Sequence, residues 1–256
     1  MNLRRLALPL LALTCLLARP ALAFETAAKA AIMLDNRTGQ VLFAKDPDVA
    51  LPPASMSKLM TAYVAFEQLK QGRLKLDDML PVSEHAWKMG GSQMFLEVGD
   101  RVSVSDLLRG IIIQSGNDAC VVVAEALAGS EPAFAEMMNA RAAELGLTAS
   151  HFVNSNGLDE PGHLMSVRDL AVLARRIIQE FPEYYSIYSE REYTYGGIKQ
   201  RNRNPLLQAG VPGVDGMKTG YTSQAGYGLV TSALRGDQRL ILVVTGLPSL
   251  KARRAA

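Results

Sequence analysis

Short apolar stretches separated by turns occupy the two ends of the chain, whereas apolar residues in its middle recur at helical spacing. Near the start, residues 28–34 and 40–45 resemble strands on either side of the turn Asn36-Arg37-Thr38-Gly39. Glycine supplies the positive φ that such a hairpin turn requires. A later group of strands is expected at about 191–200, 213–219, 226–234 and 239–246. The apolar runs 228–233 and 240–244 suit central strands of a sheet.

Helical periodicity and capping residues predict helices between these two groups of strands. Residues 56–70 carry apolar side chains three and four positions apart and stop before Gly72. Ser130 and Ser166 each precede a further helix, and the second helix stops before Pro182. Strands at both ends with helices between them favour an α+β fold, in which an antiparallel sheet is flanked by helices and by a mainly helical subdomain.

The first 23 residues are typical of a secretory signal. Arg4 and Arg5 precede an apolar run from Leu6 to Ala18, and Ala21-Leu22-Ala23 offers small residues for cleavage. The apolar run is shorter than the roughly 20 residues that span a bilayer, which favours cleavage over anchoring. We therefore expect an exported, periplasmic protein whose mature chain, residues 24–256, is one domain without a membrane anchor.

Composition excludes several classes of protein. Loss of the three arginines of the predicted signal leaves 24 basic and 25 acidic residues, so no basic excess favours nucleic acid. Only Cys120 follows the signal, which rules out an intramolecular disulfide, and its apolar neighbours predict a buried, inert thiol. His85, His151 and His163 lack the spacing of zinc ligands. We expect neither a metal nor an organic cofactor.

The strongest chemical signal begins with Ser55-Met56-Ser57-Lys58 at the start of the first predicted helix. Ser55 and Lys58 are one turn apart and therefore share a face of the helix, so the amine can reach the hydroxyl. A serine becomes a good nucleophile when a base takes its proton, and lysine can be that base if burial or a second cation lowers its pKa. Lys218 is the expected second cation. A helix-capping serine beside a solvated lysine is the alternative for this motif alone.

A second motif, Ser115-Gly116-Asn117, falls in a predicted loop before another helix. Ser115 could pass a proton to a leaving amine, while Asn117 could hold Lys58 and bind a substrate amide. Either Ser115 or Asn117 could instead serve as the cap of the following helix.

The third motif, Lys218-Thr219-Gly220, lies on the strand predicted at 213–219. Gly220 would leave room for a substrate backbone along the edge of the strand, while Lys218 and Thr219 would face a carboxylate. The backbone N–H of Tyr221, paired with that of Ser55, would form an oxyanion hole. An exposed lysine on an ordinary strand is the alternative.

Together the three motifs resemble the signature shared by penicillin-binding proteins and class A β-lactamases. Nearly the whole mature chain is similar to the low-molecular-weight penicillin-binding proteins that act as D-alanyl-D-alanine carboxypeptidases. The similar segments are 35–39, 53–61, 90–94, 115–120, 156–158 with 162–163, 202–204 and 214–227. The resemblance implies a serine peptidase that removes the terminal D-alanine from peptidoglycan stem pentapeptides through an acyl-enzyme on Ser55. It also implies covalent inhibition by β-lactams.

The same resemblance places Arg203 and Arg253 near the terminal carboxylate of the substrate, which a bidentate guanidinium fits better than lysine does. Surface solvation is the alternative for Arg253. Tyr221 stands where family members often carry histidine, so only its backbone donor is carried over. Family members continue beyond Arg253 through a helix, a β-rich domain and an amphipathic membrane helix. We therefore expect a C-terminally truncated catalytic domain with apolar sheet surface uncovered and reduced stability.

Three other functions remain open. A D,D-endopeptidase would use the same residues on peptidoglycan crosslinks. A class A-like β-lactamase would need a Glu-x-x-Leu-Asn string, and the nearest string, Glu144-Leu145-Gly146-Leu147-Thr148, ends in threonine. The middle motif of a class A β-lactamase would also read Ser-Asp-Asn, whereas this chain has Ser-Gly-Asn. A non-catalytic peptidoglycan-binding module would typically lack Ser55 or Lys58.

Overall fold

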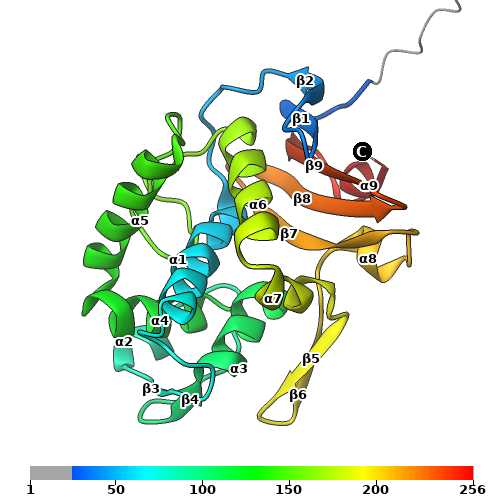
Figure 1. Cartoon of the computed structure of the whole chain (residues 1–256). Coiled ribbons are helices and arrows are strands. Elements are labelled where there is room, and N and C mark those ends of the chain that lie inside the picture. Colours follow the sequence, from blue (N-terminus) through cyan, green and yellow to red (C-terminus); the bar gives the residue numbers. More distant parts are fainter. Residues whose placement is uncertain (1–24, 256) are drawn as a thin grey trace, which may run out of the picture.

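An antiparallel five-stranded sheet runs through the molecule (Figure 1). The computed structural model describes residues 25–255, so the predicted signal at 1–23 lies outside the described residues. The strand order in the sheet is β2-β1-β9-β8-β7. The strands are β1 (Ala30–Asp35), β2 (Val41–Lys45), β7 (Val214–Thr222), β8 (Gly226–Arg235) and β9 (Gln238–Leu247). The two ends of the sequence thus meet in one sheet, as the pattern of strands predicts.

The centre of the sheet comes from the most apolar runs of the sequence. Val230 on β8 and both Ile241 and Val243 on β9 are fully buried, which confirms the expected central strands. The predicted hairpin turn between β1 and β2 is also present. Gly39 has a φ of +75°, and its N–H donates to the Asp35 carbonyl at 2.8 Å.

The prediction of a single strand at about 191–200 is wrong. This stretch forms a hairpin of β5 (Glu192–Tyr195) and β6 (Ile198–Arg201), which pair with each other outside the main sheet. Gly196 and Gly197 both have positive φ, at +53° and +78°, and they reverse the chain in two residues. Another small ribbon joins β3 (Met79–Pro81) to β4 (Arg101–Ser103).

Four long helices and several short ones fill the space beside the sheet. The predicted caps are confirmed, because the side chains of Ser130 and Ser166 accept hydrogen bonds from the N–H groups of Ala133 and Asp169. The long helices are α1 (Lys58–Lys70), α4 (Asn117–Ala128), α5 (Glu131–Leu145) and α6 (Val167–Glu180). The short ones are η1 (Ala54–Ser57), α2 (Glu84–Trp87), α3 (Val104–Arg109), η2 (Gly110–Gln114), α7 (Pro182–Tyr185), η3 (Ser186–Ser189), α8 (Pro205–Gln208) and α9 (Leu250–Ala255).

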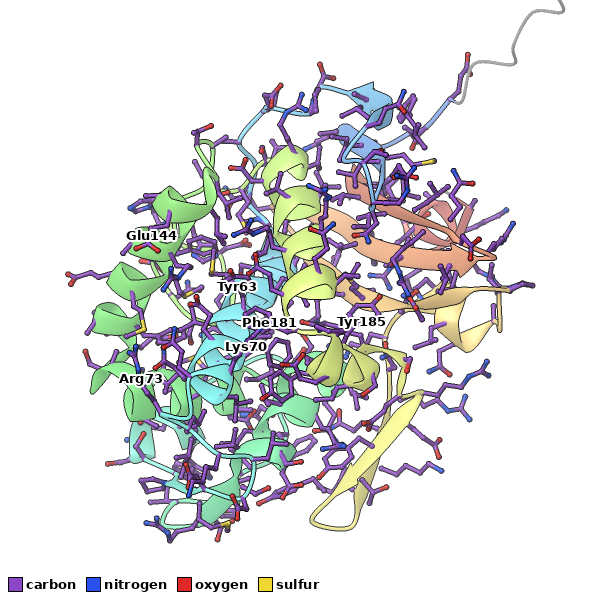
Figure 2. All side chains as sticks on the ribbon, in the orientation of Figure 1. Tyr63, Lys70, Arg73, Glu144, Phe181 and Tyr185 are labelled. Atoms are coloured by element: carbon purple, nitrogen blue, oxygen red, sulfur yellow. The ribbon has the colours of Figure 1, made fainter. Side chains whose placement is uncertain are left out.

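The helices cover the sheet on both faces. Helix α6 packs on β1 and β9 and separates the sheet from α1, while α9 contacts β8 and β9 (Figure 1). Tyr63 of α1 meets Phe181 at the end of α6 edge to face, with ring centroids 5.1 Å apart, and Lys70 lies over the same ring (Figure 2). These contacts hold α1 and its N-terminal turn η1 between the sheet and the helical subdomain. Within residues 25–255, no helix has the length and apolar character needed to cross a membrane.

A buried histidine makes the fold sensitive to acid. His163 is 2% exposed, and its Nδ1 accepts a hydrogen bond from the Val153 N–H at 3.2 Å. Its Nε2 is buried with no hydrogen-bond partner among the described residues. Burial therefore lowers the pKa of His163 from 6.5 to about 4.

We predict that folding stability falls between pH 6.5 and 4, because the unfolded chain protonates His163 in this range and the folded chain does not. The full difference corresponds to about 3 kcal/mol. Urea unfolding of wild type and His163→Asn across this range should show a shallower pH dependence in the variant. The exposed His151 provides the control, and equal slopes in His163→Asn and His151→Asn would contradict the assignment.

Candidate active site

The three motifs meet where η1 and α1 approach the edge strand β7 and the start of α4. Lys58 Nζ lies 2.9 Å from Ser55 Oγ and donates to Asn117 Oδ1 at 2.7 Å. Lys218 Nζ, on β7, donates to Ser115 Oγ at 2.8 Å. The five polar residues of the sequence prediction therefore form one cluster from three distant parts of the chain.

Ser55 lies in a tight turn held by close backbone packing. The turn is a 3₁₀ helix instead of the first turn of α1, and Ala54 within it has a φ of +48°. This conformation is unfavourable for a residue with a Cβ, so its surroundings must hold it in place. The Ser57 hydroxyl helps by donating to the Ala54 carbonyl at 3.1 Å.

Two glycines allow neighbouring segments to reach this turn. A Cβ on Gly157 would stand 2.2 Å from the Ala54 carbonyl oxygen, and one on Gly220 would stand 2.8 Å from that of Pro53. Gly220 is thus needed for the close approach of the Ser55 turn, and the room that it leaves for a substrate backbone stays a prediction. Gly220 lines the open site, but the direction in which a side chain would point is filled by the Ser55 turn.

The segment around Ser115 directs its side chains into the site. Ser115 adopts a left-handed conformation with a φ of +64°, and α4 begins after Gly116, which makes no side-chain cap. The alternative that Ser115 or Asn117 caps this helix is thus wrong. The Asn117 amide makes other contacts, because Oδ1 accepts from Lys58 and Nδ2 donates to the Gly90 carbonyl at 2.7 Å.

Burial dominates the electrostatics of the two lysines. Lys58 and Lys218 are 1% and 3% exposed. The pKa of Lys58 is lowered to about 8, chiefly by desolvation; the charge of Arg203 also lowers it, while Asp118 acts in the opposite direction.

The pKa of Lys218 is held well below its ordinary value, first by burial and then by the charge of Lys58. Burial is therefore the main cause of the lowered Lys58 pKa, and the cation that adds to it is Arg203, whereas the sequence indicated Lys218. The two amines titrate as a coupled pair, since a proton on one disfavours a proton on the other. A neutral amine is therefore available in the site near neutral pH.

An open cavity of about 510 Å³ lies directly beside Ser55. Its walls combine hydroxyl groups, two guanidinium groups and an apolar side. The lining residues are Ser55, Ser92, Ser115, Arg203, Thr219, Gly220, Tyr221, Tyr227, Leu250 and Arg253. Every predicted substrate-binding residue therefore borders the cavity.

The burial of the Arg253 side chain contradicts the alternative that it is solvated at the surface. It is 7% exposed, its guanidinium lies 5.5 Å from the centre of the Tyr227 ring, and burial lowers its pKa. Its Nε is buried and has no partner within the part of the chain that the structure describes. A buried cation without an anion at the wall of a cavity suits the binding of a ligand carboxylate.

Several contributors to the site carry no motif of their own. Asn156 accepts a hydrogen bond from Lys58 Nζ through its backbone carbonyl, a group that every residue type possesses. Ser92, which accepts from Arg203 at 2.5 Å, and Tyr227, which stacks on Tyr221, lie in segments signalled only by the family resemblance. No motif and no segment of the family resemblance pointed to Leu250.

Comparisons with known proteins agree with one another. The family model described as D-alanyl-D-alanine carboxypeptidase matches residues 17–249. The D-alanyl-D-alanine carboxypeptidase DacC of Escherichia coli K12 is 47% identical over 232 residues, covering 88% of this chain and 58% of that protein. DacF of Bacillus subtilis is 43% identical over 89% of this chain and 59% of its own length. The chain therefore spans less than two thirds of these relatives.

Solved structures share the fold. Penicillin binding protein 5 of Haemophilus influenzae matches with a TM-score of 0.88 and 45% identity, covering 90% of this chain and 68% of that one. Penicillin-Binding Protein D2 of Listeria monocytogenes in its ampicillin-bound form matches with a TM-score of 0.81 and 30% identity, covering 90% and 93%. The α+β fold class predicted from the sequence is confirmed.

We predict that Gly157→Ala destabilises the protein more than Gly72→Ala. Both glycines have positive φ, at +81° and +69°, but only the new Cβ at 157 would collide with backbone. Overpacking should add about 1–3 kcal/mol to the common cost of the left-handed conformation. Urea unfolding measures the difference, and equal losses in the two variants would show that the loop is free to move away from the Ser55 turn.

Proposed function

The chain belongs to the D-alanyl-D-alanine carboxypeptidase family, and we propose that it removes the terminal D-alanine from peptidoglycan stem pentapeptides through an acyl-enzyme on Ser55. The observation that carries this proposal is the 2.9 Å contact between Ser55 Oγ and the buried amine of Lys58. A serine needs a base at this distance to become a nucleophile.

The partners of Lys58 orient its lone pair. The oxygen atoms of the Asn117 side chain and the Asn156 backbone can only accept hydrogen bonds from the amine. A neutral Lys58 therefore directs two N–H bonds toward these oxygens, and its lone pair remains for the hydroxyl proton of Ser55. Ser55 Oγ attacks the carbonyl carbon of the penultimate D-alanine as this proton moves to Lys58.

The other motif residues complete the transfer. The backbone N–H groups of Ser55 and Tyr221 would stabilise the developing oxyanion. As the carbon–nitrogen bond breaks, the Ser115 hydroxyl gives its proton to the leaving D-alanine and recovers one from Lys218, which it contacts at 2.8 Å. Water then hydrolyses the ester and releases the shortened peptide. Lys58 returns its proton to the oxygen of Ser55, and the proton released with the new carboxylate restores Lys218.

The cationic wall of the cavity accounts for a preference for a C-terminal residue. Arg253, with its unpaired buried Nε, and Arg203 would bind the terminal carboxylate of the peptide together with Thr219. A β-lactam carries a carboxylate beside a reactive amide and would acylate Ser55 in the same position. This inhibition is supported by the ampicillin-bound form of the Listeria relative.

Export follows from the substrate. Residues 1–23 would act as a cleaved signal, and the catalytic domain at 24–256 would work in the periplasm, where peptidoglycan lies. The β-lactamase alternative requires a Glu-x-x-Leu-Asn string, and the nearest string, residues 144–148, does not match it. Glu144 is exposed near the C-terminal end of α5 and pairs with Arg141 (Figure 2).

Intact-protein mass spectrometry with benzylpenicillin and a diacetyl-Lys-D-Ala-D-Ala tripeptide tests this function. We expect a penicilloyl adduct on wild type and release of D-alanine from the peptide. Both should be absent in Ser55→Ala because the nucleophile is missing. Penicillin hydrolysis without a lasting adduct would indicate a β-lactamase. No adduct and no turnover would indicate a binding module.

The rate of acylation by benzylpenicillin should rise with pH and level off above about pH 8. The neutral amine of Lys58 is the proposed base, and its pKa is lowered to about 8. Lys58→Arg keeps a positive charge at every accessible pH, so acylation should slow by about 10²- to 10⁴-fold. A profile that is flat from pH 6 to 9 would exclude Lys58 as the titrating base.

A further inference from the structure

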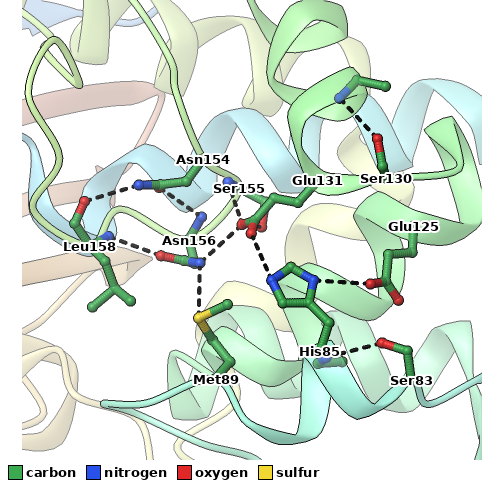
Figure 3. Close-up of polar contacts among 12 residues, drawn as sticks. Ser83, His85, Met89, Glu125, Ser130, Glu131, Asn154, Ser155, Asn156 and Leu158 are labelled. Carbon is green, nitrogen blue, oxygen red and sulfur yellow. Dashed lines mark hydrogen bonds and ion pairs between the residues drawn. The ribbon is translucent and has the colours of Figure 1, made fainter.

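A buried carboxylate lies beside Ser155 and Asn156, in the loop that contacts Lys58 (Figure 3). Glu131, the first residue of α5, is 8% exposed. Its Oε1 accepts hydrogen bonds from the Ser155 N–H at 2.9 Å, the Ser155 hydroxyl at 2.5 Å and the Asn156 side chain at 3.0 Å. Three donors converging on one oxygen make Glu131 the main anchor of this part of the loop on the α5 side.

The opposite side of the same loop contacts the helix that carries the base. The Asn156 carbonyl accepts from Lys58 Nζ, and the Ser155 carbonyl accepts from the Thr61 hydroxyl at 2.5 Å. Lys58 and Thr61 are one turn apart on α1. Residues 153–158 contain no helix or strand, so their position relative to α1 depends on these side-chain contacts.

Contacts within the loop shape it without placing it. Asn154 Oδ1 accepts from the Gly157 N–H at 2.8 Å. Asn156 Oδ1 accepts from the Leu158 N–H at 2.9 Å (Figure 3). Such local bonds stabilise a turn. The distance of the loop from Lys58 is set by contacts to other elements. Gly157 packs against Ala54, and Thr61 donates to the Ser155 carbonyl. Glu131 accepts three hydrogen bonds from residues 155 and 156.

His85 provides a matched comparison on the other side of Glu131. Its Nε2 lies 3.8 Å from Glu131 Oε2, and its Nδ1 lies 3.1 Å from Glu125 Oε1. The His85 side chain is 52% exposed, so these pairs contribute little. Glu125 touches the same histidine as Glu131 and makes no hydrogen bond to the loop among the described contacts.

We propose that Glu131 is a positioning residue for acyl transfer, which it serves by holding the Asn156 carbonyl on Lys58 Nζ. The inference rests on the function proposed above. With the carbonyl in place, the neutral amine has two fixed acceptors and its lone pair faces Ser55. Without Glu131 the loop moves relative to α1, and the amine can turn its lone pair away from the hydroxyl.

The test compares Glu131→Ala, Glu131→Gln and Glu125→Ala in the acylation of the full chain by benzylpenicillin. Misplacement of the base predicts that Glu131→Ala is about 10- to 100-fold slower than wild type. Glu131→Gln keeps an oxygen for the Ser155 donors and should recover most of the rate. Glu125→Ala should match wild type, and melting temperatures establish that each variant is folded.

The pH profile separates positioning from a general loss of stability. Removing the negative charge of Glu131 should move the midpoint of acylation to lower pH, because this charge favours protonated Lys58. The other groups acting on Lys58 stay the same in every variant. They are Cys120, Arg203, Asp118 and Lys218.

A folded Glu131→Ala with the wild-type rate and midpoint would overturn the proposal, as would an equal loss in Glu125→Ala. If Glu131→Ala does not fold, Ser155→Ala decides instead. Combined with Asn156→Ala, it removes two of the three donors to the carboxylate and keeps both backbone carbonyls. A wild-type rate in this double variant would refute the role of Glu131, whereas a slower rate would support it. Absence of an adduct on wild type would refute the proposed function itself, and this role with it.

Discussion

The burial of one amine organises the rest of this structure. Lys58 lies at the start of α1 with 1% of its surface exposed. Removing an ammonium group from water is costly, so its proton affinity falls and its hydrogens must find partners. Ser55, Asn117 and Asn156 provide these partners from three separate segments. The same burial that makes the amine a usable base therefore also determines which groups must surround it.

Close packing of backbone then places the nucleophile. The turn carrying Ser55 contains Ala54 in a left-handed conformation, and both Gly157 and Gly220 approach it too closely for any side chain. An unfavourable local conformation persists only where surrounding contacts hold it. The strand edge on one side and the loop on the other provide this constraint, so the geometry of the nucleophile depends on tertiary structure.

The cavity beside Ser55 adds selectivity to this reactive pair. Its walls place the guanidinium groups of Arg203 and Arg253 near the nucleophile, and the buried Nε of Arg253 has no hydrogen-bond partner within residues 25–255. Such a cation suits a ligand carboxylate bound in the cavity beside Ser55. In the proposed function, this arrangement would favour reaction at the last peptide bond of a chain.

The sequence by itself determined three things: the strands at both ends of the chain, the long helices between them and the motif residues. These depend on local periodicity, capping and side-chain chemistry. Ser130, Ser166 and Gly39 show this, since each acts where it stands in the chain. Only tertiary structure decided that residues 192–201 form a separate hairpin and that Gly220 faces the Ser55 turn. It also decided that a backbone carbonyl at Asn156 and a carboxylate at Glu131 support Lys58. Contacts between distant segments and groups common to all residues leave no pattern along a sequence, and so they become visible only when the chain is folded.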